Sequence, residues 1–193
     1  AAVAEVARKQ DLLVMSDEIY ARLTYGIEHT CFAALSGMQE RTVLLGGFSK
    51  AYAMTGWRIG YAAGPREIIA AMTKIHQYTI MCAPTMAQVA ALEALRGGED
   101  SVLEMVADYN RRRELIVKGL RDIGFSCFEP KGAFYAFPNI TMSGLSSEMF
   151  AEKLLQEEKV AVVPGTAFGA CGEGYVRCCY ATSLPDLEEA LVR

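Results

Sequence analysis

Short apolar runs alternate with helical patterns through the first half of the chain. Each run is rich in leucine, valine, isoleucine or glycine and ends at polar residues or glycine, which is typical of strands buried on both faces of a sheet. The predicted strands cover residues 12–15, 41–47 and 57–64. Apolar residues at helical spacing predict helices at roughly residues 1–10, 65–77 and 84–97. This alternation predicts an α/β fold with a mostly parallel sheet and helices packed against it.

The pattern changes after about residue 100. Ser101 to Glu104 has the form of a capping box, which predicts the start of a long helix to about Asp122, closed by Gly124. The charged middle of this helix, residues 110–114, favours a solvated helix face. Further along, short strands are predicted within residues 125–130, 132–138, 159–165 and 174–181, with helices at about 146–158 and from Ser183, where a second capping box begins.

These patterns predict two units joined by a helix. Residues 1–100 form part of a larger α/β domain, residues 101–122 form a connecting helix, and residues 123–193 form a small α+β domain. Both ends of the chain fall within helical patterns, so we expect a fragment of a longer protein.

Composition excludes several classes of protein. The net charge is −4, with acids and bases mixed along the chain, which argues against a nucleic-acid-binding face. No apolar run approaches the ~20 residues that a membrane span needs. The six cysteines form no C-x-x-C pair, and His29 and His76 lie far apart, so we expect neither a metal site nor a disulfide framework. Reduced thiols favour a cytoplasmic protein.

Lys50 is the first candidate for chemistry. It follows the predicted strand at 41–47 and the pair Gly46-Gly47, and ligands of α/β sheets bind beyond the carboxyl ends of strands. Apolar surroundings disfavour the charged form of a lysine and make its amine a nucleophile. A surface lysine is the ordinary alternative. A phosphate-binding loop of the G-x-x-x-x-G-K-[ST] type is excluded, because Ala51 follows the lysine and the first glycine is missing.

Asp17 and Tyr20 have a similar placement after the first predicted strand. A carboxylate there could hold a protonated ring nitrogen, and a phenol could donate to a neighbouring oxygen. The ordinary alternative for Asp17 is a helix cap or a solvated turn.

Two arginines lie in apolar segments. Arg58 is suited to a phosphate, with Ser49 as an additional hydroxyl donor, or to a salt bridge with a core carboxylate. Arg177 lies in a predicted strand between valine and cysteine, where it is suited to a substrate carboxylate or to an exposed cross-strand contact.

Taken together, these segments resemble the class I and II aminotransferases, which are fold type I pyridoxal-phosphate enzymes, and in particular the aspartate and aromatic aminotransferases. The resemblance covers the whole chain and is carried by SDEIYARLTY, GGFSKAYAMTGWRIGYAAGP, KGAFYAFP, VVPGTAFG and YVRCCYATS. It implies that the chain is the C-terminal half of such an enzyme, with residues 1–100 as part of the large cofactor-binding domain and 123–193 as most of the small domain.

The resemblance also implies roles for single residues. Lys50 would bind pyridoxal 5′-phosphate as a Schiff base and carry protons, with Asp17 on the ring nitrogen and Tyr20 on the phenolic oxygen. Ser49 and Arg58 would hold the phosphate, and Arg177 would hold the α-carboxylate of an amino-acid substrate. Two departures from the family pattern are Gly47, where a phosphate-binding serine is often found, and Cys178-Cys179, where isoleucine-serine is common.

Three functions remain open at this stage. The first is transfer of an amino group between an amino acid and a 2-oxo acid, by a homodimer when intact. The second is another reaction on the same scaffold, such as C–S bond cleavage by β-elimination. The third is a non-catalytic sensor domain. We expect the chain by itself to be inactive, and the sequence does not name the amino-acid donor.

Overall fold

The computed structural model describes residues 1–193. The chain divides into two compact units, Ala1–Glu104 and Met105–Arg193. The division falls within the long helix α4 (Glu99–Asp122), near its first turn.

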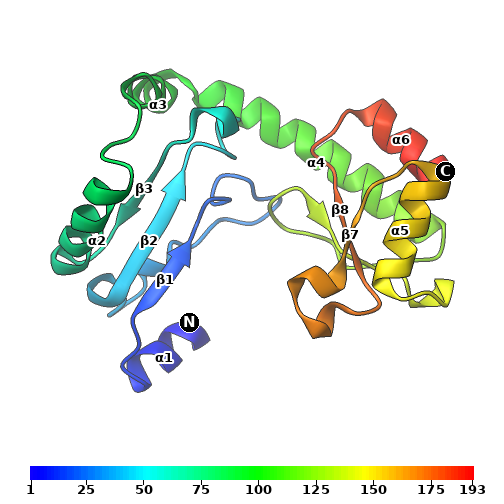
Figure 1. Ribbon diagram of the computed structural model, residues 1–193, viewed down its shortest axis with the longest axis horizontal. Helices are drawn as coiled ribbons and strands as arrows, with labels where there is room; N and C mark the ends of the chain where they lie inside the picture. The colour runs from blue at the N-terminus through cyan, green and yellow to red at the C-terminus, as the bar shows by residue number, and fades with distance from the viewer. The chain divides into compact units, whose positions relative to one another are not determined.

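The first unit is built on a three-stranded sheet. Its strands β1 (Val14–Asp17), β2 (Thr42–Gly47) and β3 (Gly60–Ala63) lie side by side in that order (Figure 1). β1 and β2 are parallel, whereas β2 and β3 are antiparallel. The strand predicted at 57–64 begins only at Gly60, because residues 55–57 form the short 3-10 helix η3 (Thr55–Trp57) and Arg58 has a left-handed backbone conformation.

Three helices accompany this sheet where the apolar spacing predicts them. They are α1 (Ala2–Lys9), α2 (Arg66–Thr79) and α3 (Thr85–Gly97). Two further 3-10 turns, η1 (Phe32–Ala34) and η2 (Gln39–Arg41), lie between β1 and β2.

The first strand, β1, differs in position and in burial from the strand that the sequence predicts at residues 12–15. β1 lies two residues further along than 12–15, and only one of its faces is covered. Ala4, Ala7 and Met38 form a buried cluster against which Val14 packs. Met15, which points to the opposite face because strand side chains alternate, is 73% exposed. Burial on both faces was therefore a wrong prediction for β1.

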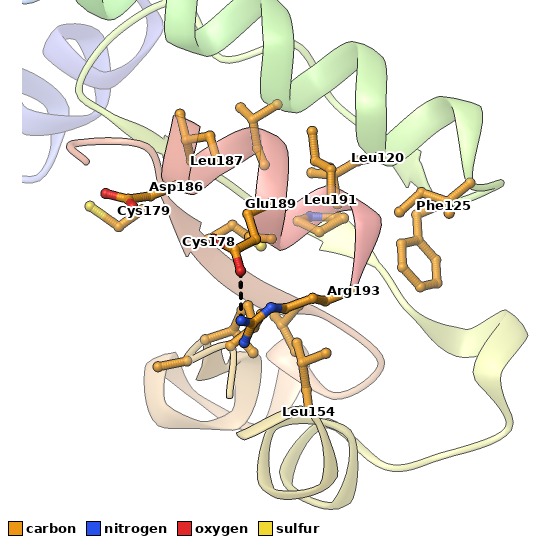
Figure 2. Close-up of a pocket in the computed structure, with 18 of the residues that line it drawn as sticks. Leu120, Phe125, Leu154, Cys178, Cys179, Asp186, Leu187, Glu189, Leu191 and Arg193 are labelled. Carbon is orange, nitrogen blue, oxygen red and sulfur yellow. Dashed lines mark hydrogen bonds and ion pairs between the residues drawn. The ribbon is translucent and has the colours of Figure 1, made fainter. Parts of the chain in front are cut away.

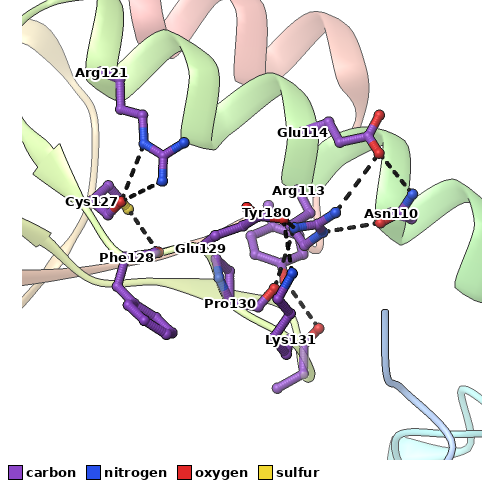
Figure 3. A network of polar contacts seen from close by, with 11 residues as sticks. Asn110, Arg113, Glu114, Arg121, Cys127, Phe128, Glu129, Pro130, Lys131 and Tyr180 are labelled. Carbon is purple, nitrogen blue, oxygen red and sulfur yellow. Dashed lines mark hydrogen bonds and ion pairs between the residues drawn. The ribbon is translucent and has the colours of Figure 1, made fainter. Parts of the chain in front are cut away.

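The long helix begins earlier than the capping box predicts. The amide of Val102 donates to Gly98 O at 3.0 Å, so α4 begins at Glu99 and Ser101 lies within its first turn. The solvated face predicted for residues 110–114 is also wrong at one position. Arg113 is only 7% exposed, because it turns toward the segment that follows the helix and pairs with Glu129 at 2.6 Å (Figure 3).

The second unit contains two small sheets. β4 (Ser126–Cys127) pairs with β6 (Pro138–Asn139), and a second sheet has the order β5 (Tyr135–Ala136), β8 (Val176–Cys179), β7 (Val163–Pro164). The short turns between them are η4 (Thr141–Ser143), η5 (Gly165–Phe168) and η6 (Ala170–Gly172). All of its strand pairs are antiparallel.

Two capped helices complete this unit. α5 (Ser147–Glu158) begins where the Ser146 hydroxyl accepts from the Met149 amide, and α6 (Leu184–Val192) begins where the Ser183 hydroxyl accepts from the Asp186 amide. The helix start predicted at Ser183 is therefore confirmed, since its side chain makes the bond that defines a helix N-cap.

A cavity of about 680 Å³ lies among α4, α5, α6 and β8 (Figure 2). Its apolar lining includes Leu120, Phe125, Leu154 and Leu187. Burial and the neighbouring thiols Cys127 and Cys179 raise the pKa of the Cys178 thiol to about 12. Charged residues also line this space, among them Glu189 and Arg193, which form an ion pair at 2.6 Å (Figure 2). None of the candidate site residues lies in its lining. No helix in the chain combines the length and apolar character needed to cross a membrane.

Candidate functional site

Four candidate residues of the first unit meet at one edge of the sheet. Asp17 ends β1 opposite Leu45 of the parallel strand β2, so the carboxyl ends of both strands lie at this edge. β2 ends at Gly47, and Ser49 and Lys50 follow within three positions. Because β3 runs antiparallel and begins at Gly60, opposite Gly47, Arg58 returns to the same edge two residues earlier. Tyr20, the fifth candidate in this unit, lies in the turn that follows Asp17.

The turn that carries Lys50 is fixed by its neighbours. The carbonyl oxygen of Phe48 accepts from the amides of Tyr52 at 3.3 Å and Met54 at 3.2 Å. The side chains of Phe48 and Met54 are buried against Ala91 of α3. Lys50, two residues after Phe48, is half-buried. Its position therefore depends on packing between the turn and α3 as well as on the end of β2.

Close approach of β2 and β3 requires glycine at this edge. A Cβ atom at Gly60 would lie 2.9 Å from the carbonyl oxygen of Gly46, and one at Gly46 would lie 2.4 Å from the ring of Tyr61. At Gly60 the contact is with backbone, so a side chain there requires the strands to shift, whereas at Gly46 it is with the end of the Tyr61 side chain, which would have to move. The glycines in GGFSK and RIGY thus allow the segments with Lys50 and Arg58 to come together.

Arg58 has a strained backbone. Its φ of 51° and ψ of 49° place it in the left-handed region, which non-glycine residues seldom occupy. Its Nη1 donates to the carbonyl oxygen of Thr55 at 2.8 Å. The side chain is exposed and forms no ion pair, so the alternative of a salt bridge to a core carboxylate does not apply. Strain of this kind is concentrated at functional sites.

Asp17 is exposed, and its Oδ1 accepts from the amide of Ile19 at 3.2 Å. This bond is the turn-capping role that the sequence left open for Asp17. It occupies one oxygen of the carboxylate. Tyr20 follows in the same turn and is half-buried, and the amide of Leu23 donates to its carbonyl oxygen at 2.8 Å.

Glu18 is a polar contributor that the sequence interpretation missed. Its side chain is 8% exposed and accepts from the Ser16 hydroxyl at 3.0 Å, the Phe32 amide at 2.9 Å and the His29 ring at 2.7 Å. Burial raises the pKa of the Glu18 carboxyl, but the hydrogen bonds from His29, Phe32 and Ser16 outweigh it and lower the pKa below its ordinary value. Glu18 therefore ties the loop around residues 29–32 to the end of β1. An acid next to Asp17 was visible in the sequence, but its distant partners were not.

Arg177 belongs to the second unit. It lies on β8, half-buried, and its Cζ is 4.4 Å from the ring centroid of Tyr135 and 4.7 Å from that of Phe168. Its Nε is buried and has no hydrogen-bond partner. The expected alternative, an exposed cross-strand charge, does not describe this side chain. Neither aromatic contact was predicted from the sequence.

Comparison with known proteins identifies the family. The family model for aminotransferase class I and II matches residues 1–193. The chain belongs to this family. The α/β fold and the family expected from the sequence are therefore confirmed. Enzymes of the class I and II aminotransferase family use pyridoxal 5′-phosphate as cofactor.

Individual relatives agree with this assignment. The chain is 61% identical over 191 residues to the protein YugH of Bacillus subtilis, with 99% of the chain and 50% of that protein covered. It is 49% identical over 194 residues to an aspartate aminotransferase of Pyrococcus abyssi, with 99% and 50% covered. The crystal structure of an aromatic aminotransferase from Pyrococcus horikoshii OT3 superposes with a TM-score of 0.96 at 47% identity, with 99% and 52% covered. The chain thus spans about half the length of the relatives it matches.

Proposed function

We propose that the intact protein is a pyridoxal-phosphate-dependent aminotransferase that moves an amino group between an amino acid and a 2-oxo acid. The family match and the aspartate and aromatic aminotransferase names of its relatives support this activity. The observation that carries the proposal is the convergence of Asp17, Lys50 and Arg58 at one sheet edge. In the same proposal, residues 1–100 belong to the large domain, 101–122 to the connecting helix and 123–193 to the small domain.

The groups at this edge fit the cofactor. The Lys50 amine is suited to its aldehyde, the Asp17 carboxylate to a protonated ring nitrogen, and the Tyr20 phenol to its phenolic oxygen. The Ser49 hydroxyl and the exposed Arg58 guanidinium are suited to its phosphate. When bound, the cofactor supplies an electron sink for negative charge at the α-carbon of the substrate.

The chain's own residues then bind, orient and move protons. Lys50 acts as the base and acid that moves a proton at its Nζ. Asp17, whose Oδ1 is held by the Ile19 amide, orients a ring nitrogen and keeps it protonated. Arg177 holds the α-carboxylate of the substrate, since a guanidinium binds a carboxylate through two parallel hydrogen bonds.

Borohydride trapping tests the central assignment. Reduction of the intact protein with its cofactor, followed by peptide mass spectrometry, should place the cofactor mass on Lys50. The Lys50→Ala variant should lose the visible absorbance of the bound cofactor, whereas Lys74→Ala, an exposed position on α2, should keep it. Trapped cofactor on another lysine would overturn the assignment.

An assay of the intact protein with a panel of amino donors and 2-oxoglutarate then distinguishes amino-group transfer from β-elimination. Formation of glutamate supports the proposal, whereas release of sulfide from a sulfur amino acid without glutamate would favour C–S cleavage.

We also propose a homodimer in the cytoplasm, as the family resemblance and the cysteine pattern suggest. Light scattering of the intact protein would measure the oligomeric state, and a monomer that retains full activity would contradict it.

A further inference from the structure

Two aromatic rings contact the guanidinium of Arg177. The Cζ–centroid distances of 4.4 Å to Tyr135 and 4.7 Å to Phe168 are both within the ~6 Å range of cation–π contacts. We call Tyr135 and Phe168 the aromatic cradle. A guanidinium has five N–H donors, so one that contacts aromatic rings can still donate hydrogen bonds. The buried, unpartnered Nε of Arg177 is such a donor, and buried donors are normally satisfied.

Strand pairing holds the Tyr135 side of the cradle. Tyr135 of β5 lies opposite Cys179 of β8, and Arg177 is two residues from Cys179 on the same strand. Residues two apart share a face of a sheet, so the Tyr135 ring and the Arg177 side chain are diagonal neighbours on one face. A side-chain hydrogen bond also joins the residues beside these two strands: the hydroxyl of Tyr180, just after β8, donates to the carbonyl oxygen of Ala133, just before β5, at 3.1 Å.

A buried arginine holds the segment that leads into β5. Arg113 of α4 donates to Glu129 at 2.6 Å and to the carbonyl oxygen of Pro130 at 3.4 Å (Figure 3). Its Nε also donates to the Asn110 side chain at 3.0 Å. The approach to Tyr135 is thus tied to α4 through a side chain that is itself almost fully buried.

The Phe168 side is held by a tight turn. Gly165 and Gly172 approach so closely that a Cβ at Gly165 would lie 2.0 Å from the carbonyl oxygen of Gly172. The fully buried Ser147 hydroxyl of α5 accepts from the amides of Gly174 at 2.9 Å and Tyr175 at 3.2 Å. These contacts fix the segment on which Phe168 is carried, although the Phe168 side chain itself is 52% exposed.

We propose that Tyr135 and Phe168 are positioning residues for the carboxylate-binding guanidinium of Arg177. This inference rests on the proposed function, because it assumes that Arg177 holds the substrate carboxylate. An arginine side chain has several rotatable bonds and loses conformational freedom when it is ordered. Two rings that contact it before the substrate arrives restrict that freedom in advance, which strengthens binding without any new contact to the substrate.

The test uses the intact protein loaded with cofactor and the probe 3-phenylpropanoate, a carboxylate that has no amine. Tyr135→Leu and Phe168→Leu, made separately, should each weaken probe binding about three- to tenfold in calorimetry. The KM for the amino acid should rise by a similar factor while kcat stays nearly unchanged, as expected for lost uniform binding. In ¹⁵N-arginine spectra, the ring-current shift of the Arg177 Nε–H signal should diminish in each variant.

Two matched variants separate ring contact from a general structural effect. Tyr135→Phe keeps the ring and should bind the probe like the unaltered protein. Phe125→Leu removes a ring that packs edge-on against Phe150, with centroids 5.9 Å apart, and makes no ring contact with the cradle or with the Arg177 guanidinium, so it should leave probe binding unchanged. Loss of affinity in either matched variant as large as in Tyr135→Leu would overturn the role of the cradle.

Arg177→Ala distinguishes the inference from the proposed function beneath it. If Arg177→Ala weakens probe binding but both leucine variants bind normally, only the cradle is overturned. If Arg177→Ala binds the probe normally and keeps its cofactor, the carboxylate role of Arg177 in the proposed function is overturned as well. Because the two cradle positions lie on separate segments, a folding defect in one variant leaves the other as a complete test.

Discussion

Gly47 of β2 and Gly60 of β3 lie opposite each other in an antiparallel strand pair. Lys50 follows the first glycine by three residues, and Arg58 precedes the second by two. The chain between them turns through η3 and returns to the same sheet edge. This register therefore brings the segments with Lys50 and Arg58 to the same sheet edge, as their proposed roles at one cofactor require.

Gly60→Ala should damage this edge. A Cβ at Gly60 would lie 2.9 Å from the carbonyl oxygen of Gly46, so the strands must shift. We expect the free energy of unfolding in urea to fall by about 1–3 kcal/mol, with weaker cofactor retention. Gly56→Ala is the matched control, because a Cβ there has no atom within 4 Å, and its effect should stay within about 0.5 kcal/mol. Equal effects of the two variants would contradict the close-approach argument.

Glu18→Gln should remove a pH-dependent contribution to stability. The pKa of Glu18 is lowered in the folded protein, so its contribution is present above the ordinary pKa of about 4.3 and is lost as pH falls through the lower, folded value. At pH 7 the variant should unfold about 1–3 kcal/mol more easily, because an amide replaces one acceptor oxygen of the carboxylate.

Urea titrations between about pH 7 and pH 3 would measure this effect. The difference between Glu18→Gln and the unaltered protein should shrink below about pH 5. Glu28→Gln, at an exposed position, is the control and should change stability little at any pH. A Glu18→Gln difference that stays constant across the titration would rule out a charged Glu18 as its source.

Arg113→Gln should destabilise the second unit. The Arg113 side chain is buried, and the variant leaves Glu129 and Pro130 without their guanidinium partner. We expect the Tm to fall by about 5 °C or more in thermal unfolding. Arg111→Gln, two residues away on the exposed side of α4, removes only a surface pair with Asp108 and should leave the Tm nearly unchanged. An unchanged Tm in Arg113→Gln would show that the hydrogen bonds of the buried Arg113 do not stabilise the second unit.

Ser147→Ala should loosen the turn that carries Phe168. The variant leaves the amides of Gly174 and Tyr175 without an acceptor in a fully buried position. Such a loss costs about 1–3 kcal/mol of unfolding free energy. Hydrogen exchange should also show faster exchange of these two amides, whereas Ser126→Ala, at an exposed position on β4, should change neither quantity. Unchanged amide protection in Ser147→Ala would refute this role of the hydroxyl.

Local signals in the sequence identified most elements and several site candidates. The apolar spacing predicted α2 and α3, and the serine at 183 predicted the cap of α6 through a bond that spans three residues. Lys50 and Arg58 were found because GGFSK and GWRIGY are distinctive over a short stretch. The roles of Lys50, Asp17, Tyr20, Ser49, Arg58 and Arg177 stay predictions until the variants above are measured.

Contacts between segments distant in the chain could not be predicted from the sequence. The charged run around Arg113 indicated a solvated face, yet its partner Glu129 lies 16 residues further along and made burial of the guanidinium possible. Glu18 likewise gained its low pKa from His29 and Phe32, which reach it only through the folded loop.

By itself, the sequence determined the period of each helix, several of its ends, the family and the residue types available for chemistry, because these depend on neighbours a few positions apart. Only the tertiary structure decided which charges are buried, which strand face stays open and which rings contact Arg177. The physical reason is that burial and hydrogen-bond partners come from segments distant in the chain, and their free energies exist only once the chain has folded.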